Sequence, residues 1–328
     1  MNHRYPFPVE GYPAEGYAGT WAVEPERTIP WTYDGYDTPN NIDYSTPAQN
    51  EPGPWAINSD MAMVDLSHPW GNDQPTWPAG AQPYMTPVQY MSKFNRRTQL
   101  AMGMPEHVST HYDAPAHVCQ ESPFVHEVPL EKFMAPAVIW SIPCTPMQTI
   151  TPEMLEEANK RCPMKPGDYT IIVTGWHRLY SDSDRYFLWS PGLNEAAGEW
   201  LVAHGSAGFG IDCQALDHPL ASYMAENGPG PLVPRVMEAY QLFYPGHDPK
   251  VDHPNWEPVH EVFLKRNIPA WENIGGDVDK ILDKRCVVCA FPTRWYMGDG
   301  TKVRVVAFID KSEINPDIPD RTYNYGTY

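Results

Sequence analysis

The feature that most constrains the fold of this chain is an alternation of strand-like and helix-like segments, which begins near Met61 and continues to about residue 310. The strand-like segments are short apolar runs of β-type residues, and the helix-like segments carry apolar residues at helical spacing. The strand-like runs are 135–142, 169–176 and 207–212, and the helix-like segments are 151–162, 194–205 and 258–267. This alternation predicts a single α/β domain.

Residues at the ends of the helix-like segments have the properties of helix caps. Thr151 and Asn194 are the first residues of the first and second segments, where a side-chain oxygen can accept a hydrogen bond from a free backbone N–H. Gly205 is the last residue of the second segment and Asn267 the last of the third, and both residue types adopt the left-handed conformation that terminates helices. These residues predict where the helices begin or end.

Residues 285–310 form two apolar runs joined around Asp299-Gly300, a pair typical of a hairpin turn or loop. The first run contains Cys286 and Cys289 in a CxxC pattern. A zinc knuckle requires a second such pair, which the sequence lacks, so we interpret both cysteines as strand or core residues. The six cysteines are scattered along the chain, which predicts reduced thiols in a cytosolic protein.

Proline and aromatic residues are concentrated in residues 1–58, which show no lasting periodicity. Such a segment cannot bury a core of its own, so we expect an irregular extension that wraps onto the main body or onto a neighbouring subunit. Residues 311–328 are polar and are predicted to form a C-terminal tail. The predicted organisation is therefore an extension, one α/β domain over 59–310, and a tail.

The net charge of -18 argues against two classes of partner. A field of this sign repels phosphate backbones and anionic membranes, so we expect neither nucleic acid nor a membrane as a partner. The first twenty residues lack the apolar stretch of a signal peptide, and no run approaches the ~20 apolar residues of a membrane span. The chain also has no GxSxG nucleophile elbow and no phosphate-binding glycine loop. These absences favour a cytoplasmic protein that acts on a small molecule, and disfavour serine hydrolases and nucleotide enzymes.

The strongest indication of chemistry is the segment HVSTHYDAPAH, which contains His107, His111, Asp113 and His117. Two imidazoles and a carboxylate suit Zn²⁺ or Mn²⁺, and three protein ligands leave positions open for water and substrate. In an extended strand the first two histidines would lie ~13 Å apart, at ~3.3 Å per residue. One shared ion therefore requires a bend, which a small polar residue such as Ser109 tolerates. The alternative is a surface loop that collects several histidines by chance.

This segment resembles the HxGTHxDxPxH motif of the cyclase family of metal-dependent hydrolases, which includes bacterial kynurenine formamidase, isatin hydrolase and some polyketide cyclases. Ser109 stands where the motif has glycine. Four more segments match the family pattern in the right order, so the resemblance covers most of residues 61–310. They are VDLSHPWGNDQPTWP (64–78), GDYTIIVTGW (167–176), SPGLNEAAGEWLVAHGSAGFGID (190–212) and VHEVFLKRNIPAWENI (259–274). The resemblance implies a swivelling β/α/β domain with a mixed sheet.

The resemblance also implies which residues bind metal. His107, His111 and Asp113 would be ligands of a divalent cation. In kynurenine formamidase-like members a His and a Glu serve a second metal, and they match His260 and Glu272 here. We therefore expect one or two ions of Zn²⁺ or Mn²⁺, with Asp113 able to bridge them. Helix capping for His260 and a solvated charge for Glu272 are the alternatives.

The motif further implies that His117 transfers a proton between the attacking water and the leaving group, a task for which imidazole is suited. The alternative is that His117 is a further metal ligand or a hydrogen-bond partner of a ligand. The implied function is hydrolysis of a small amide, formamide, imide or lactone by a metal-activated water. A polyketide-type cyclase or dehydratase, which would use the metal to polarise a ketone, is one alternative. A non-catalytic metal-binding protein is the other.

Four aromatic residues are candidates for lining a substrate pocket, although turn or core positions remain the alternative: His68, Trp77, Tyr112 and Trp176. Asp212 and Asp217 follow a predicted strand, where α/β folds tend to place functional loops. A homo-oligomer, either a dimer or a tetramer, is expected. The sequence identifies neither the substrate nor the choice between Zn²⁺ and Mn²⁺.

Overall fold

The computed structural model describes residues 60–319, apart from 73, 78–79, 90–98, 120, 182–183 and 223–234. The chain divides into two units, Met1–Ala56 and Ile57–Tyr328, and every described residue belongs to the second. The predicted extension over 1–58, and the predicted tail from residue 320 onward, lie outside the described residues. Within the described ranges, no helix combines the length and the apolar character needed to cross a bilayer.

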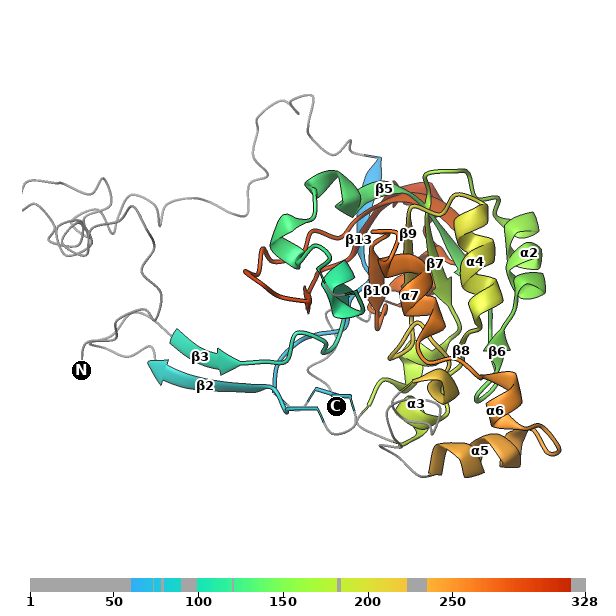
Figure 1. Cartoon of the computed structure of the whole chain (residues 1–328). Coiled ribbons are helices and arrows are strands. Elements are labelled where there is room, and N and C mark those ends of the chain that lie inside the picture. Colours follow the sequence, from blue (N-terminus) through green and yellow to red (C-terminus); the bar gives the residue numbers. More distant parts are fainter. Residues whose placement is uncertain are drawn as a thin grey trace, which may run out of the picture. The chain divides into compact units, whose positions relative to one another are not determined.

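A curled mixed β-sheet forms the centre of the described unit (Figure 1). The strands in order across the sheet are β1 (Met61–Asp65), β13 (Val306–Asp310), β11 (Lys284–Cys289), β5 (Met134–Ser141), β7 (Tyr169–Val173), β9 (Gly208–Ile211), β10 (Ala270–Glu272), β4 (His111–Asp113) and β12 (Gly300–Lys302). The strands β5, β7, β9 and β10 run parallel to one another, and antiparallel strands extend the sheet on both sides. The predicted α/β fold with a mixed sheet is therefore confirmed.

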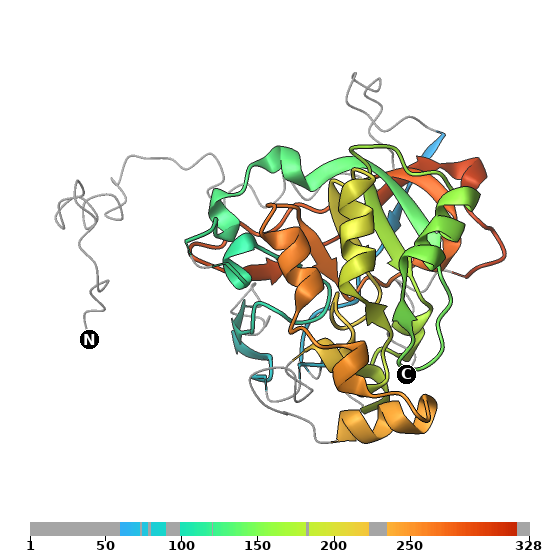
Figure 2. The ribbon, with the colours of Figure 1, turned by 45° about the vertical axis from the view of Figure 1, so that its right-hand side comes forward.

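Three helices cover one face of this sheet, and both views show them side by side in front of the central strands (Figure 1, Figure 2). These helices are α2 (Pro152–Arg161), α4 (Glu195–Ala203) and α7 (Pro258–Leu264). All three lie inside the segments predicted as helices. Because they pack on the parallel strands, they fix the ends of those strands in space.

Most of the predicted caps are present at the helix ends. Asn194 accepts a hydrogen bond from the Ala197 N–H at 2.9 Å, at the start of α4. Gly205 and Asn267 have φ angles of 86° and 53°, the left-handed conformation predicted for helix ends. Thr151 precedes α2 as predicted, but its hydroxyl donates to the Glu153 side chain and caps no backbone N–H.

Separate hydrophobic cores form on the two faces of the sheet because side chains alternate along each strand. On β5, Val138 and Trp140 pack beneath the helices, whereas Ala137 and Ile139 pack on the opposite face. Apolar residues of β1, β11 and β13 join the second core, so the curled sheet covers part of its own face. Burial on both faces makes the central strands a rigid support for side chains at their ends.

The remaining described elements are short. Apart from the main sheet, β2 and β3 form an antiparallel two-stranded ribbon, and β6 and β8 form a short parallel pair. These elements and the shorter helices are β2 (Tyr84–Gln89), β3 (Gln99–Gly103), β6 (Thr149–Ile150), β8 (Gly192–Leu193), α3 (Asp184–Leu188), α5 (Arg235–Phe243) and α6 (Pro249–Asp252).

Of the two alternatives predicted around Asp299-Gly300 in the segment 285–310, the structure has the loop and not the hairpin turn. Strands β11 and β13 pair antiparallel, but Asp299-Gly300 is not the turn between them. Instead, the connecting chain crosses to the far end of the sheet, where Gly300 of β12 pairs with Asp113 of β4. A local turn pattern cannot show this crossing, because long-range packing decides which strands pair. The crossing matters for function, since it brings Asp299 beside the histidine segment.

Strand β11 contains two of the cysteines and contacts the start of the predicted tail. Cys286 and Cys289 are free thiols within β11, so their interpretation as strand residues is confirmed. After β13 the chain forms a 3-10 turn over Lys311–Glu313, and Glu313 pairs with Lys284 of β11 at 2.7 Å. The first residues of the predicted tail therefore contact the sheet.

Candidate metal centre

Two neighbouring strands of the sheet carry most of the candidate ligands. His111 and Asp113 lie at the two ends of β4, and Glu272 of β10 stands directly opposite His111 in the strand register. His260 comes from the first turn of α7. The fold thus brings the His and Glu expected for a second metal next to the histidine segment, although they lie far from it in the sequence.

A residue in the left-handed conformation produces the bend that the two histidines require. Ser109 has a φ of 56°, in the region that favours glycine, which is the residue of the family motif at this position. Its hydroxyl donates a hydrogen bond to the Pro69 carbonyl at 2.8 Å. The bend brings the rings of His107 and His111 to a centroid separation of 5.1 Å. Serine therefore replaces glycine here without loss of the backbone geometry.

Asp113 lies at the centre of the cluster. Its Oδ1 is 2.7 Å from His107 Nδ1 and 3.3 Å from His111 Nε2. Its Oδ2 is 3.7 Å from His260 Nε2, which is itself 3.1 Å from Glu272 Oε1. Ligand atoms within each half of this cluster lie within 4.8 Å of one another. One carboxyl group therefore faces two adjoining positions, an arrangement that suits one ion or two.

The buried polar atoms of the cluster fit a divalent cation. His107 Nε2, His111 Nε2 and both carboxyl oxygens of Asp113 are buried without a hydrogen bond of acceptable geometry. Leaving such atoms without a partner is costly, and buried charges are normally paired or bound to metal. Imidazole nitrogens and carboxylate oxygens are ligands that both Zn²⁺ and Mn²⁺ accept. The residues present therefore fit the metal that the resemblance implies.

Neighbouring groups turn two of the imidazoles toward the cluster. His111 Nδ1 donates to the Ser109 carbonyl at 2.8 Å, and His260 Nδ1 donates to Asp217 Oδ2 at 2.6 Å. Both acceptors require a proton on Nδ1, which leaves Nε2 as the nitrogen that faces the cluster with a lone pair. This preorganisation is typical of histidines that bind metal.

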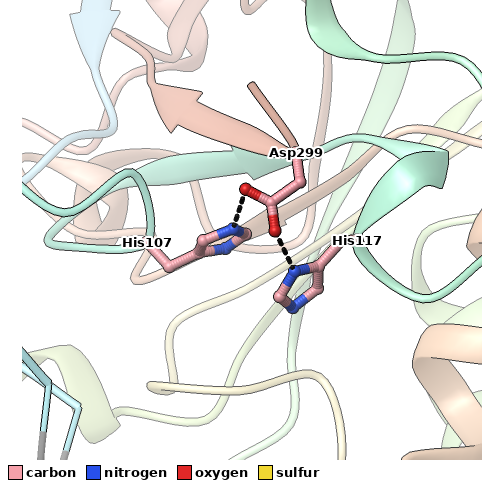
Figure 3. A group of neighbouring side chains, drawn as sticks. All are labelled: His107, His117 and Asp299. Atoms are coloured by element: carbon pink, nitrogen blue, oxygen red, sulfur yellow. Dashed lines mark hydrogen bonds and ion pairs between the residues drawn. The ribbon is translucent and has the colours of Figure 1, made fainter. Parts of the chain in front are cut away.

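His117 lies beside the cluster and is held by Asp299 (Figure 3). Its Nδ1 donates to Asp299 Oδ2 at 3.0 Å, while Asp299 Oδ1 lies 3.4 Å from His107 Nε2. The His107 and His117 rings stack with centroids 4.0 Å apart. One carboxyl group thus positions both imidazoles, and the second nitrogen of His117 is left available for proton transfer.

Charges within the cluster shift the pKa values of neighbouring histidines in opposite directions. Burial opposes the positive charge of His107, but Asp113 and Asp299 outweigh it and raise the pKa to about 10. Burial and the nearby His107 lower the pKa of His117, although Asp299 acts in the other direction. At neutral pH and without a cation, His107 therefore holds a proton, whereas His117 is neutral and can accept one.

A cavity of about 280 Å³ adjoins the cluster and provides room for a small substrate. Its wall contains all the histidines of the cluster together with one of the acidic groups. These residues are His107, His111, His117, His260 and Glu272. Asp113 is fully buried.

Two of the candidate pocket residues have different positions in relation to this cavity. Trp77 lines it. Tyr112 does not, because its ring is completely buried and packs edge-on against Phe133. Side chains alternate along a strand, so Tyr112 points away from the face that His111 and Asp113 share. Of the two alternatives for Tyr112, its position is that of a core residue and not of a pocket residue.

The other two candidates, Trp176 and His68, also lie outside the lining of this cavity. Trp176 is part of the core beneath the helices, and its indole N–H donates to the Tyr186 carbonyl at 2.9 Å. His68 is buried and stacks on Tyr180 with a centroid separation of 3.8 Å. Both residues support the fold near the site rather than contact a substrate in this cavity.

The two aspartates after the predicted strand also differ. Asp217 reaches the cluster through its hydrogen bond to His260, whereas Asp212 accepts a hydrogen bond from His177 Nδ1 at 2.7 Å. Asp299 is a site residue that no motif indicates. Its Asp-Gly pattern is typical of a turn, and its neighbours in the site come from a segment 182 residues away. No local signal in the sequence could have identified it.

Comparisons with known proteins agree with this description. The family model described as "Putative cyclase" matches residues 64–218. The kynurenine formamidase of Bordetella petrii is 28% identical over 162 residues, which cover 47% of this chain and 70% of the relative. The kynurenine formamidase of Bordetella avium is 23% identical over 251 residues, which cover 74% of this chain and 96% of the relative.

Solved structures share the fold. An isatin hydrolase bound to the product analogue thioisatinate superposes with a TM-score of 0.63 at 17% identity, covering 77% of this chain and 94% of that chain. Isatin hydrolase A from Ralstonia solanacearum superposes with a TM-score of 0.60 at 20% identity, covering 76% of this chain and 92% of that chain. The likeness extends over nearly the whole of the two solved structures and about three quarters of this chain.

Taken together, the fold and the cluster define an α/β protein with a candidate centre for a divalent metal. Residues 64–218 match the family model described as "Putative cyclase", and the solved isatin hydrolases share the fold, in agreement with the cyclase family of metal-dependent hydrolases that the sequence segments predict.

Proposed function

We propose that this protein hydrolyses a small amide, formamide, imide or lactone by means of a metal-activated water. One observation carries the proposal: His111 Nε2 and the two carboxyl oxygens of Asp113, all buried without a hydrogen bond, converge with His107 Nδ1 next to His117. The names of relatives support it, because they include kynurenine formamidases and isatin hydrolases.

The cluster would hold one or two ions of Zn²⁺ or Mn²⁺. His107, His111 and Asp113 would bind the first ion, and His260 and Glu272 would bind a second that shares Asp113. A divalent cation at this place supplies a water of lowered pKa and polarises the carbonyl group of the substrate.

His117 would move the proton that the reaction releases. Asp299 occupies its Nδ1–H, so Nε2 is the atom that accepts a proton from the attacking water. The same nitrogen then delivers the proton to the departing nitrogen or oxygen of the substrate. The lowered pKa of His117 keeps its ring neutral before the reaction, which a general base requires.

A polyketide-type cyclase or dehydratase is the second candidate, and the description of the matching family model favours it. It would use the same cation to polarise a ketone. Metal-loaded protein should be tested with a panel of formyl-anilines, cyclic amides and lactones. Turnover of at least one class, lost on chelation, is the expected result. Absence of turnover across the panel would reject hydrolysis and leave the cyclase reaction as the one to test.

We also propose that the protein is a homo-oligomer, either a dimer or a tetramer. Tyr84, Val88 and Met102 are exposed on the β2–β3 ribbon. A two-stranded ribbon is only marginally stable by itself in water, so a second copy would supply the missing cover. Light scattering of the full chain tests this, and a monomer at micromolar concentration would contradict it.

Cytoplasmic localisation is proposed as well. All six cysteines are free, which suits a reducing compartment. Cell fractionation tests this proposal, and recovery of the protein outside the cytoplasm would contradict it.

A further inference from the structure

Beyond the metal ligands, the cavity wall has an unusual balance of charge. Among the described residues that line it there is no lysine or arginine, whereas Glu106 and Glu257 add two carboxyl groups to the acidic ligand Glu272. Trp77 and Phe187 supply apolar surface in the same wall. A substrate that enters this cavity therefore meets aromatic surface and negative groups, but no cationic side chain that would bind an anion.

Glu106 already has a partner in the protein. Its Oε2 accepts a hydrogen bond from the Asp299 N–H at 3.1 Å, so Glu106 helps to position Asp299, which in turn binds His117. It is therefore not free to bind a substrate.

Glu257 is different, because no described side chain or backbone group hydrogen-bonds or pairs with its carboxyl group. It precedes α7 with φ 43° and ψ 44°, the left-handed conformation, and its N–H donates to the Ala221 carbonyl at 2.6 Å. A long side chain in this conformation is strained by about 1 kcal/mol or more. Burial also raises the pKa of this carboxyl group to about 7. Strain and desolvation without a partner indicate a group whose partner comes from outside the chain.

Gln214 supplies a second unpartnered acceptor in the same wall. Its Nε2 donates to the Phe187 carbonyl at 2.9 Å, and because a carbonyl only accepts, this contact fixes the orientation of the amide. The oxygen Oε1 is left buried and without a hydrogen-bond partner, in a side chain that is only 3% exposed. A buried acceptor of this kind requires an N–H or O–H donor from a bound molecule.

From these two groups we infer that the substrate carries an amine, protonated to an ammonium group, at some distance from the carbonyl that is attacked. The ammonium group would pair with Glu257, and a neighbouring N–H would donate to Gln214 Oε1. Trp77 and Phe187 would contact the apolar part of the molecule. That the bound molecule is a substrate rests on the proposed hydrolysis. The preference for an amine does not, because it exists whether or not the ligand reacts.

Calorimetry with an unreactive ligand pair tests the preference. Phenylethylamine and phenylethanol have the same ring and chain length, but only the amine carries a positive charge at neutral pH. Binding should be measured to the full-length protein, both loaded with Zn²⁺ and after chelation. Amine coordination to a metal cannot contribute in the chelated sample. The amine should bind at least about tenfold more tightly than the alcohol in both samples, as a desolvated ion pair predicts.

Substitutions then assign the preference to one side chain. Glu257→Gln should remove the advantage of the amine and leave the affinity for the alcohol within about twofold. Glu257→Gly should do the same while relieving the strain of the left-handed conformation, so it remains informative if the glutamine variant folds poorly. Glu261→Gln is the matched control: it makes the same change on an exposed residue of α7 that pairs with Lys265.

The outcomes separate this inference from the proposed function. Equal binding of the amine and the alcohol, or an amine preference that survives both Glu257 substitutions, would overturn the inference. A preference that depends on Glu257, in a protein that hydrolyses no member of the substrate panel, would retain the inference and reject the hydrolase.

Discussion

Asp217 accepts two hydrogen bonds from His260, one from its backbone N–H at 3.0 Å and one from its imidazole Nδ1 at 2.6 Å. Its other oxygen accepts from the Val259 N–H at 2.8 Å. A single buried carboxyl group therefore caps the start of α7 and sets the tautomer of a candidate ligand. Helix stability and ligand geometry depend on the same side chain.

Replacing Asp217 with asparagine should weaken metal binding. The variant loses the charge that holds the Nδ1 proton of His260, so the ring is no longer fixed with Nε2 toward the cluster. We expect metal affinity to fall about 10- to 100-fold, with a loss of stability of about 2 kcal/mol. Competition with a fluorescent chelator measures the affinity.

Asp212→Asn is the matched control, because Asp212 binds the imidazole of His177 in the same way. It should cost similar stability but change metal affinity by less than about twofold. Equal losses of metal affinity in the two variants would show a general effect of unfolding and contradict the role given to Asp217.

Ser109 should tolerate glycine but not a β-branched residue. Glycine adopts the left-handed conformation freely and loses only the hydroxyl, which donates to the carbonyls of Pro69 and His68, so Ser109→Gly should change stability by no more than about 1 kcal/mol. Ser109→Val should cost about 1–3 kcal/mol and reduce metal occupancy, since valine resists a positive φ. Thermal unfolding and metal analysis check both, and a valine variant as stable as the glycine variant would refute the strained bend.

His117→Gln should separate proton transfer from metal binding. The variant lacks a nitrogen that can exchange a proton near neutral pH, so kcat should fall about 10²- to 10⁴-fold. Metal content should stay the same, because the two groups of ligand atoms that share Asp113 do not include His117, and a loss of metal would instead indicate that the group of His107, His117 and Asp299 holds an ion. Unchanged activity would reject His117 as the proton carrier even if the metal is present.

Metal binding should release protons. In the absence of a cation, Asp113 and Asp299 raise the pKa of His107 to about 10 against the effect of burial, so the ring is protonated at pH 7. An imidazole that binds a metal must be neutral, so binding displaces that proton, and affinity should rise between pH 6 and 9 by about tenfold per unit for each proton released. Calorimetry in buffers of different ionisation enthalpy counts the protons. Heats that do not depend on the buffer would contradict this.

The part of the site that could be predicted from sequence is the part whose residues are neighbours in the chain. His107, His111 and Asp113 lie within seven residues, and the need for a bend near Ser109 follows from strand dimensions alone. His260 and Glu272 could be assigned only through the family resemblance, because the packing of α7 and β10 brings them to the cluster.

Other features depend on contacts that no local pattern encodes. Asp299 reaches His117 only because β12 pairs with β4, and its Asp-Gly pattern, typical of a hairpin turn or loop, does not indicate this pairing. Tyr112 has an aromatic side chain of the kind that lines substrate pockets, but the alternation of side chains on β4 directs it into the core. The strands and helices themselves were predictable because burial on two faces imposes a clear apolar pattern on them.

The central claim, that side chains of the segment from His107 to Asp113 bind a divalent cation, is tested most directly by metal analysis of the purified full-length protein. Mass spectrometry of the wild type after incubation with Zn²⁺ or Mn²⁺ and removal of excess should find one or two ions per chain. Asp113→Ala should bind neither ion, because both positions share this carboxyl group. A wild-type protein without stoichiometric metal, or an Asp113→Ala variant that retains the full amount, would contradict the claim.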